Sequence, residues 1–182
     1  ITHATPAAFS AHVPSRYEEN EIARQQLTQD IEVILGGGRR HFLPTSEGGE
    51  REDGRNLLQE AADQGYNVAN TRAEFDALDE LPILGLFTPA HMSYAIDRDS
   101  SEEPSLTEMT RKAIDLLDDS SEEGFFLMVE GSRIDHAGHD NDASAHLQEI
   151  LEFDEAMAEA LSFARDDGNT LVVSVSDHET GG

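Results

Sequence analysis

Two short stretches of the chain concentrate the residue types that bind divalent metal ions. The first holds Glu130, Asp135 and His139, and the second holds the adjacent pair Asp177 and His178. Carboxylate oxygens and imidazole nitrogens together form a donor set that suits zinc and related ions. The chain contains no cysteine, so any zinc has to be bound by histidine and carboxylate. These residues therefore predict a divalent-metal site.

The spacing within each stretch decides how its donors can point. Asp135 and His139 are four positions apart, so a helical turn would place both side chains on one side, where they can share one ion. Adjacent residues such as Asp177 and His178 point to opposite faces of a strand. If Asp177 and His178 lie in a loop beyond the strand, with Gly181-Gly182 after them, their side chains are no longer forced to opposite faces. Either pair alone is a weak signal in so acidic a chain, and the two pairs together favour the metal site.

Each stretch follows an apolar run that is typical of a buried strand. Residues 125–129 precede Glu130, residues 171–175 precede Asp177, and the pattern between them predicts a helix over 143–165. Strand, helix and strand in this order imply a parallel sheet with a right-handed crossover. Open α/β sheets bind their ligands beyond the carboxyl ends of the strands. The expected fold is therefore α/β, a three-layer α/β/α sandwich around a mostly parallel sheet.

The rest of the chain continues the alternation of strands and helices. Hydrophobic periodicity predicts strands at 31–35, 66–69 and 82–87, and helices at 19–29, 56–64, 72–78 and 104–118. No internal repeat and no linker divides the sequence. We therefore expect residues 1–182 to be an internal segment of one catalytic domain.

Glu130, Thr5 and Arg16 can each be explained by a structural role. A carboxylate at the end of a buried strand, as at Glu130, needs a cationic partner. Arg133 and a hard cation such as magnesium are equally good candidates. Thr5 before Pro6 is typical of a helix N-cap followed by proline at the first helical position. Arg16 would then lie near the end of that helix, where a cation suits the helix dipole.

The charge balance narrows the range of partners. Twelve basic and 38 acidic residues give a net charge of −26, which repels nucleic acid and anionic membranes. No apolar run is long enough to span a bilayer, and the first residues lack the pattern of a signal peptide. The only lysine is Lys112, beside 11 arginines. This composition favours adaptation to high salt, with an ordinary soluble acidic protein as the alternative.

Four segments resemble the bacterial alkaline phosphatases in order and spacing: residues 2–16, 104–118, 125–142 and 169–182. The most specific part is the block from Val129 to Asp142 together with Ser176 to Gly182. The resemblance implies hydrolysis of phosphate monoesters through a covalent phosphoserine, release of inorganic phosphate, two zinc ions and one magnesium ion per site, a homodimer, and a periplasmic or secreted location. The acidic, lysine-poor composition makes the chain look like a halophilic bacterium's member of the family.

The resemblance also implies roles for individual residues. The metal ligands that it implies are Asp135 and His139 for the first zinc, Asp177 and His178 for the second, and Thr5 and Glu130 for magnesium. Arg16 would bind phosphate through two guanidinium N–H groups, a geometry that lysine lacks. His3 and His136 occupy positions that vary within the family, where the residues tune the third metal and contact phosphate through water.

The sequence also departs from the family pattern. The nucleophilic serine of the family lies upstream of the segment that residues 2–16 match, and no serine here has that context. A shared aspartate ligand also lies upstream, and a third histidine ligand of the first zinc lies downstream. We therefore expect an internal fragment that is inactive alone, although the complete protein is an enzyme. The rival interpretations are a sulfatase-like or phosphodiesterase-like metallohydrolase and an acidic metal-binding module without catalysis.

Overall fold

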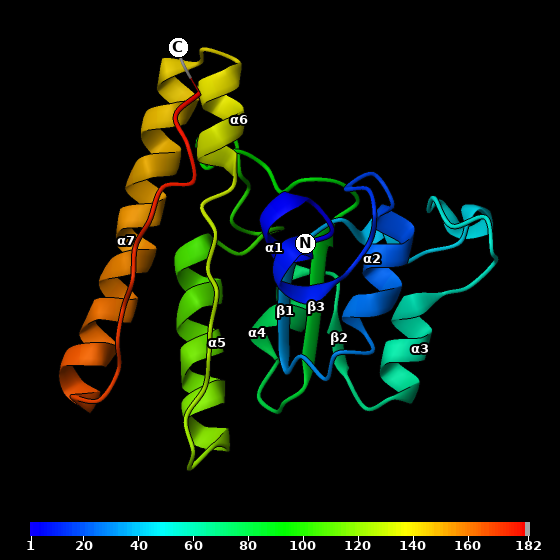
Figure 1. Ribbon diagram of the computed structural model, residues 1–182, viewed down its shortest axis with the longest axis horizontal. Helices are drawn as coiled ribbons and strands as arrows, with labels where there is room; N and C mark the ends of the chain where they lie inside the picture. Colours follow the sequence, from blue (N-terminus) through cyan, green and yellow to red (C-terminus); the bar gives the residue numbers. More distant parts are fainter. Residues whose placement is uncertain (181–182) are drawn as a thin grey trace. The chain divides into compact units, whose positions relative to one another are not determined.

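The computed structural model describes residues 1–180, which fold into two compact units (Figure 1). The first unit contains residues 1–92 and 101–103, and the second contains residues 93–100 and the chain from 104 onward. The glycine pair of the second predicted motif, Gly181-Gly182, lies outside the described residues. A single catalytic domain stays a prediction, and each unit is described by itself below.

A three-stranded parallel sheet forms the centre of the first unit. Its strands are β1 (Val33–Gly37), β2 (Asn67–Ala69) and β3 (Ile83–Thr88), in the order β1-β3-β2. All residues of β3 from Ile83 to Phe87 are buried, as a central strand covered on both faces requires. The three strands confirm the sequence prediction with shifts of one or two residues at their ends.

Helices cover both faces of this sheet. They are α1 (Ala4–Ser10), α2 (Glu19–Gln26), α3 (Leu57–Asp63) and α4 (Arg72–Asp76), with short 3-10 turns η1 (Arg39–His41) and η2 (Thr45–Glu47). Leu84 and Leu86 of β3 share a core with apolar residues of α2 and α3. Phe87 points to the opposite face, where its ring lies 5.5 Å from that of Phe75 in α4. The first unit is therefore a helix–sheet–helix arrangement.

Three helices build the second unit: α5 (Leu106–Ser120), α6 (Arg133–His139) and α7 (Ala143–Asp167). Ser105 and Glu108 form a capping box at the start of α5, and Asp142 accepts hydrogen bonds from two backbone N–H groups at the start of α7. Gly168 ends α7 in the left-handed conformation, with φ of 73°. Helix α7 packs against both α5 and α6. None of the described helices is long and apolar enough to cross a membrane.

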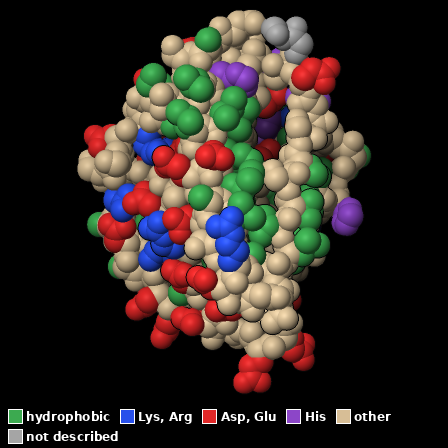
Figure 2. Space-filling view, turned by 90° about the vertical axis from the view of Figure 1, so that its left-hand side faces the viewer, with side chains coloured by type: hydrophobic (Ala, Val, Ile, Leu, Met, Phe, Trp, Pro, Cys, Tyr) green, Lys and Arg blue, Asp and Glu red, His purple; other side chains and the backbone are tan. Residues whose placement is uncertain are grey.

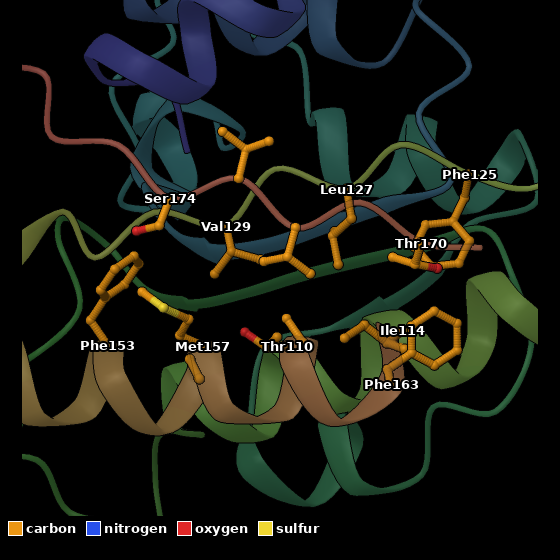
Figure 3. Close-up of a pocket in the computed structure, with 14 residues that line it drawn as sticks. Thr110, Ile114, Phe125, Leu127, Val129, Phe153, Met157, Phe163, Thr170 and Ser174 are labelled. Carbon is orange, nitrogen blue, oxygen red and sulfur yellow. The ribbon is translucent and has the colours of Figure 1, made fainter. Parts of the chain in front are cut away.

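The two strands predicted for the second unit were wrong. Residues 125–129 and 171–175 are extended, but neither belongs to a ladder among the described residues. A strand requires a neighbour that exchanges backbone hydrogen bonds, whereas these segments lie along α5 and α7. Phe125, Leu127 and Val129 line an apolar pocket with Ile114 of α5 and helix α7 (Figure 3). The side chains of Phe125, Leu127 and Val129 are half-buried, whereas Phe126 is 77% exposed.

The large apolar side chains of α7 are not its most buried residues. Leu147, Ile150, Leu151 and Leu161 are exposed by 37–55%, while Ala145, Glu149 and Ala156 are buried. Small side chains and one carboxylate face the neighbouring helices because a close helix–helix approach leaves little room for leucine there. The helix itself, predicted over 143–165, is confirmed.

Candidate metal centre

Helix α6 and the segment after residue 176 bring four of the predicted metal ligands near one another. Asp135 Oδ1 lies 3.3 Å from His139 Nε2 and 3.6 Å from His178 Nε2. His178 Nε2 also lies 3.4 Å from Asp177 Oδ2. The rings of His139 and His178 are 6.4 Å apart between centroids. The two pairs, distant in the sequence, therefore meet within the second unit.

The two segments can meet because of a glycine on α6. A Cβ added at Gly138 would lie 2.6 Å from Thr180 Oγ1 and 3.1 Å from Thr180 Cγ2. Such contacts are shorter than real Cβ atoms make, so only glycine lets Thr180 approach the helix this closely. The spacing of Asp135 and His139 on α6 is local, since four residues make about one helical turn. Gly138 thus sets how closely residue 180 approaches the helix.

The hydrogen bonds of His178 determine which of its nitrogens carries a proton. Nδ1 lies 3.1 Å from the carbonyl oxygen of Glu179, which can only accept, so Nδ1 donates. In the neutral ring, Nε2 then presents its lone pair towards the carboxylates of Asp135 and Asp177. The same carbonyl, followed by the charges of Asp177 and Asp135, raises the pKa of His178. A metal ligand with its other nitrogen bonded to a carbonyl has this arrangement.

One oxygen of the Asp135 carboxylate is buried, and its near neighbours are two imidazoles. Among the described residues, Asp135 Oδ1 is buried and makes no hydrogen bond. A buried, unsatisfied carboxylate oxygen is costly unless a cation compensates it. In a tetrahedral zinc site with ligands about 2.0–2.2 Å from the ion, neighbouring ligand atoms lie roughly 3.3–3.6 Å apart. The separations of 3.3 Å within the pair Asp135 and His139 and of 3.4 Å within the pair Asp177 and His178 each fit two ligands of one ion. Among these four described residues, no three donor atoms all lie within 4.8 Å of one another, so the geometry supports two pairs and not one four-ligand site.

Two further predicted residues lie just before and within α6. Glu130 is half-buried in the extended segment before α6, and His136 is half-buried on α6 itself. Arg133, the possible partner of Glu130, donates from Nη1 to His136 Nδ1 at 2.9 Å. The guanidinium of Arg133 also lies over the ring of Tyr94, 3.8 Å from its centroid. The choice between magnesium and arginine for Glu130 stays open.

The first unit holds the other three predicted residues. Thr5 lies inside α1, and the N-cap is His3, so the prediction of Thr5 as N-cap was wrong. The helix begins earlier than Pro6 because His3 already has the extended backbone of a cap residue. Arg16 is exposed in the turn after α1 rather than at the helix end, and its Nη2 lies 3.0 Å from His3 Nε2. Arg16 and His3 are therefore in contact.

Sequence reasoning missed Tyr94 and Thr180. Tyr94 lies in the short second-unit segment 93–100, and nothing in the local pattern connects it to Arg133. Thr180 follows the Asp177-His178 motif directly, but its packing on Gly138 depends on a contact between distant segments. A glycine within a short helix is a weak signal by itself.

The fold and this donor set define an α/β protein with a candidate divalent-metal centre, and the comparisons identify its family. The alkaline phosphatase family model matches residues 1–182. Repressible alkaline phosphatase of Saccharomyces cerevisiae is 45% identical over 207 residues, covering 100% of this chain and 37% of the yeast protein. Alkaline phosphatase 4 of Bacillus subtilis is 42% identical over 188 residues, covering 100% of this chain and 39% of the Bacillus protein. The chain belongs to the alkaline phosphatase family.

Solved structures agree with this assignment. The alkaline phosphatase of the Antarctic bacterium TAB5 superimposes with a TM-score of 0.83 at 37% identity, covering 100% of this chain and 51% of that chain. A variant of the TAB5 enzyme was solved with Mg bound in its M3 site. The fold is therefore alkaline-phosphatase-like α/β, as predicted. The relatives come from yeast, Bacillus and animals and not from bacteria alone. The chain spans 37–39% of the length of the two curated relatives named above.

Proposed function

We propose that the full-length protein hydrolyses phosphate monoesters at a metal centre that includes the second unit's donor cluster. The supporting observation is that His139 and His178 approach the buried Oδ1 of Asp135 to 3.3 and 3.6 Å. Family membership adds the reaction class, because the relatives are named alkaline phosphatases. The proposed reaction is hydrolysis through a phosphoserine. No serine of this chain has the sequence context of the family's nucleophilic serine.

The proposed ligands follow the resemblance. Two zinc ions would be held by Asp135 with His139 and by Asp177 with His178, and one magnesium ion by Thr5 and Glu130. When bound, the ions would offset negative charge on the phosphoryl group and lower the pKa of water. Arg16 would bind phosphate oxygens through its planar fork of N–H groups. His178 would keep its Nε2 lone pair available by donating from Nδ1 to the backbone.

The finer features of the protein are proposals of the same kind. A homodimer and a periplasmic or secreted location follow from the resemblance, and a halophilic bacterial origin follows from the net charge of −26 with one lysine. Substrates would be small phosphate monoesters, since the negative charge disfavours nucleic acid and anionic membranes.

Activity assays on the full-length protein test the reaction class. We expect turnover of p-nitrophenyl phosphate that is lost with a chelator and restored by zinc with magnesium. The 182-residue chain alone is expected to show none, because no serine in it has the context of the family nucleophile. A preference of the full-length protein for sulfate esters or phosphodiesters would replace the proposal by a related metallohydrolase. Tight zinc uptake without any ester hydrolysis would support the non-catalytic metal-binding module.

A further inference from the structure

A short segment of the second unit, residues 94–98, contacts helix α6 at both of its ends. The ring of Tyr94 lies under the guanidinium of Arg133, the first residue of the helix, with 3.8 Å between the guanidinium carbon and the ring centroid. The Tyr94 hydroxyl donates to Oδ2 of Asp140, the C-cap residue, at 3.2 Å. One side chain from a distant segment therefore touches the beginning and the end of α6. We call residues 94–98 the strap.

Helix α6 needs support of this kind, because its own sequence provides little. Its seven residues make about two turns, and a helix of that length is marginal by itself. Among the described residues, its N-cap Ser132 forms no side-chain cap hydrogen bond. The position of α6 therefore depends on the side chains that pack against it from other segments.

The strap contacts a different side of α6 from the one that carries the metal-binding pair. Arg133, Ala137 and Asp140 lie along one side of the helix, since they are four and three positions apart. Asp135 and His139 lie on another side, roughly 150° around the axis at 3.6 residues per turn. Ala137, in the middle of the first side, is fully buried. The strap would therefore act on a bound ion through the position of the helix and not as a ligand.

Two carboxylates of helix α7 fix the strap. Glu149 is 6% exposed, and its Oε1 accepts a hydrogen bond from the Ala95 N–H at 2.5 Å. Glu152 binds both terminal nitrogens of Arg98, with Oε2 2.8 Å from Nη1 and Oε1 2.6 Å from Nη2. The two side chains of this pair are mostly buried, and a bidentate pair of this kind has a defined geometry. Because the strap is fixed to α7, it can fix α6 relative to α7.

We propose that Tyr94 is a positioning residue that, through the strap, fixes α6 and the metal-binding side chains Asp135 and His139. The strap would also maintain the distance of 3.6 Å between Asp135 Oδ1 and Nε2 of His178. A loose α6 would have to be ordered when an ion binds, which lowers the affinity for that ion. This inference rests on the proposed metal centre for its functional meaning.

Hydrogen exchange of the metal-free, full-length protein tests the strap without any ion. We expect Tyr94→Leu to raise the exchange rates of the α6 amides about tenfold, with those of the sheet in the first unit unchanged. Arg98→Gln, which separates the strap from Glu152, should raise the α6 rates in the same direction. The matched control is Arg111→Gln, which breaks the ion pair between Arg111 and Glu159 of α7 and should leave the α6 rates unchanged. Wild-type rates in Tyr94→Leu would overturn the proposal, as would equal increases in Arg98→Gln and Arg111→Gln.

The hydrogen bond to Asp140 can be tested apart from the stacking. Tyr94→Phe keeps the ring under Arg133 and removes only the hydroxyl, so the variant should fold. Tyr94→Phe and Asp140→Ala remove opposite ends of one hydrogen bond. The α6 exchange rates of the double variant should therefore match those of either single variant. Additive increases would mean that the hydroxyl and the carboxylate do not act as one contact, and would overturn the assignment.

Zinc retention connects the strap with the candidate metal centre. In the zinc-loaded, full-length protein we expect Tyr94→Leu to lose one zinc equivalent to a chelator about tenfold more readily than the wild type, with the second equivalent retained. Arg111→Gln should retain both. Equal loss of both equivalents in Tyr94→Leu would contradict a role specific to α6, and a wild type that binds no zinc would contradict the role altogether. A protein that binds zinc but hydrolyses no phosphate ester would contradict only the proposed function, because neither measurement uses activity.

Discussion

Asp135 is the residue on which the candidate centre depends most. Its Oδ1 is the atom that both imidazoles approach, His139 at 3.3 Å and His178 at 3.6 Å, and it is buried without a hydrogen bond among the described residues. A metal ion or a protonated imidazole would offset the cost of burying this oxygen. Metal binding here would therefore also stabilise the fold.

Replacing Asp135 by asparagine is predicted to weaken zinc binding strongly. The amide has nearly the same shape but no charge, so it is a poor zinc ligand. We expect the zinc affinity of the 182-residue chain to fall by about a hundredfold or more, since even changes to the partners of ligands cost 10–100-fold. Isothermal titration calorimetry measures this. Asp154→Asn, an exposed carboxylate on α7, is the matched control and should bind zinc as the wild type does; equal losses in both variants would contradict the assignment.

Glu149 predicts a pH dependence of stability in the second unit. It is 6% exposed on α7 and accepts a hydrogen bond from the Ala95 N–H at 2.5 Å. Burial raises its pKa above the ordinary 4.5, with the Glu152 carboxylate acting in the same direction and the Ala95 N–H opposing. Because the folded state then binds the proton more tightly, ionisation costs stability. This contribution is favourable below the unfolded pKa and is lost as the pH rises through the folded pKa.

Glu149→Gln should remove that pH dependence. The variant keeps an acceptor for Ala95 but does not ionise, so its free energy of unfolding should fall less steeply as the pH rises above 4.5. Urea unfolding at a series of pH values gives the slopes. Glu155→Gln on the same helix controls for the loss of one acidic residue from an exposed position. Identical slopes for wild type and Glu149→Gln would show that burial does not perturb this carboxyl group.

At the scale of elements, the centre depends on the packing of α6 against the segment that carries His178. Asp135 and His139 could be predicted to share a side of a helix because their spacing is local. The contact with His178 depends on Gly138 and Thr180, which no periodicity connects. Proximity of the two pairs was expected at the ends of parallel strands, but the structure achieves it without a strand ladder in this unit.

Gly138→Ala is therefore predicted to separate the two halves of the centre. The new Cβ would lie 2.6 Å from Thr180 Oγ1, so the segment after residue 176 must move away from α6. We expect about tenfold weaker zinc binding with the helical content unchanged, since alanine favours helix over glycine. Thr180→Ala removes the clashing atoms, and the double variant should recover most of the affinity. Zinc binding by Gly138→Ala equal to wild type would mean that this contact does not position His178.

Elements with strong local signals could be predicted, and long-range contacts could not. The capping residues Ser105 and Asp142 mark the starts of α5 and α7 in the sequence itself. The stacking of Tyr94 on Arg133 depends on the chain returning from a distant segment, so no spacing reveals it. Thr5 misled the prediction because a threonine before proline fits an N-cap, while the backbone of His3 already provides one. Local chemistry was thus easier to infer than the partners of each side chain.

For the whole molecule, charge is the dominant feature. Acidic side chains are spread over the face shown in Figure 2, with basic side chains lying among them. Arginines pair with carboxylates, as Arg24 does with Glu21 and Arg98 with Glu152. The pair with Arg24 lowers the pKa of Glu21 to about 2. Such pairs leave most of the 38 acidic residues without a basic counterpart, since only 12 basic residues exist.

Salt is therefore predicted to stabilise the chain. Self-repulsion from a net charge of −26 acts over about 10 Å at 0.1 M salt and about 3 Å at 1 M. The free energy of unfolding should rise with sodium chloride concentration over that range. Screening of the exposed ion pairs should cost little stability, because each pair contributes little. Urea unfolding at each salt concentration measures the change, with sucrose as an uncharged control. Stability that falls as salt is added would contradict both the repulsion argument and the proposed halophilic origin.

The central claim is that the two donor pairs converge on bound metal. Anomalous diffraction at the zinc edge from crystals of the zinc-loaded 182-residue chain tests it most directly. We predict a zinc peak within about 2.0–2.2 Å of Asp135 Oδ1 and an imidazole nitrogen. Zinc bound only at other carboxylates, with the side chains of Asp135 and His178 far from any peak, would contradict the account.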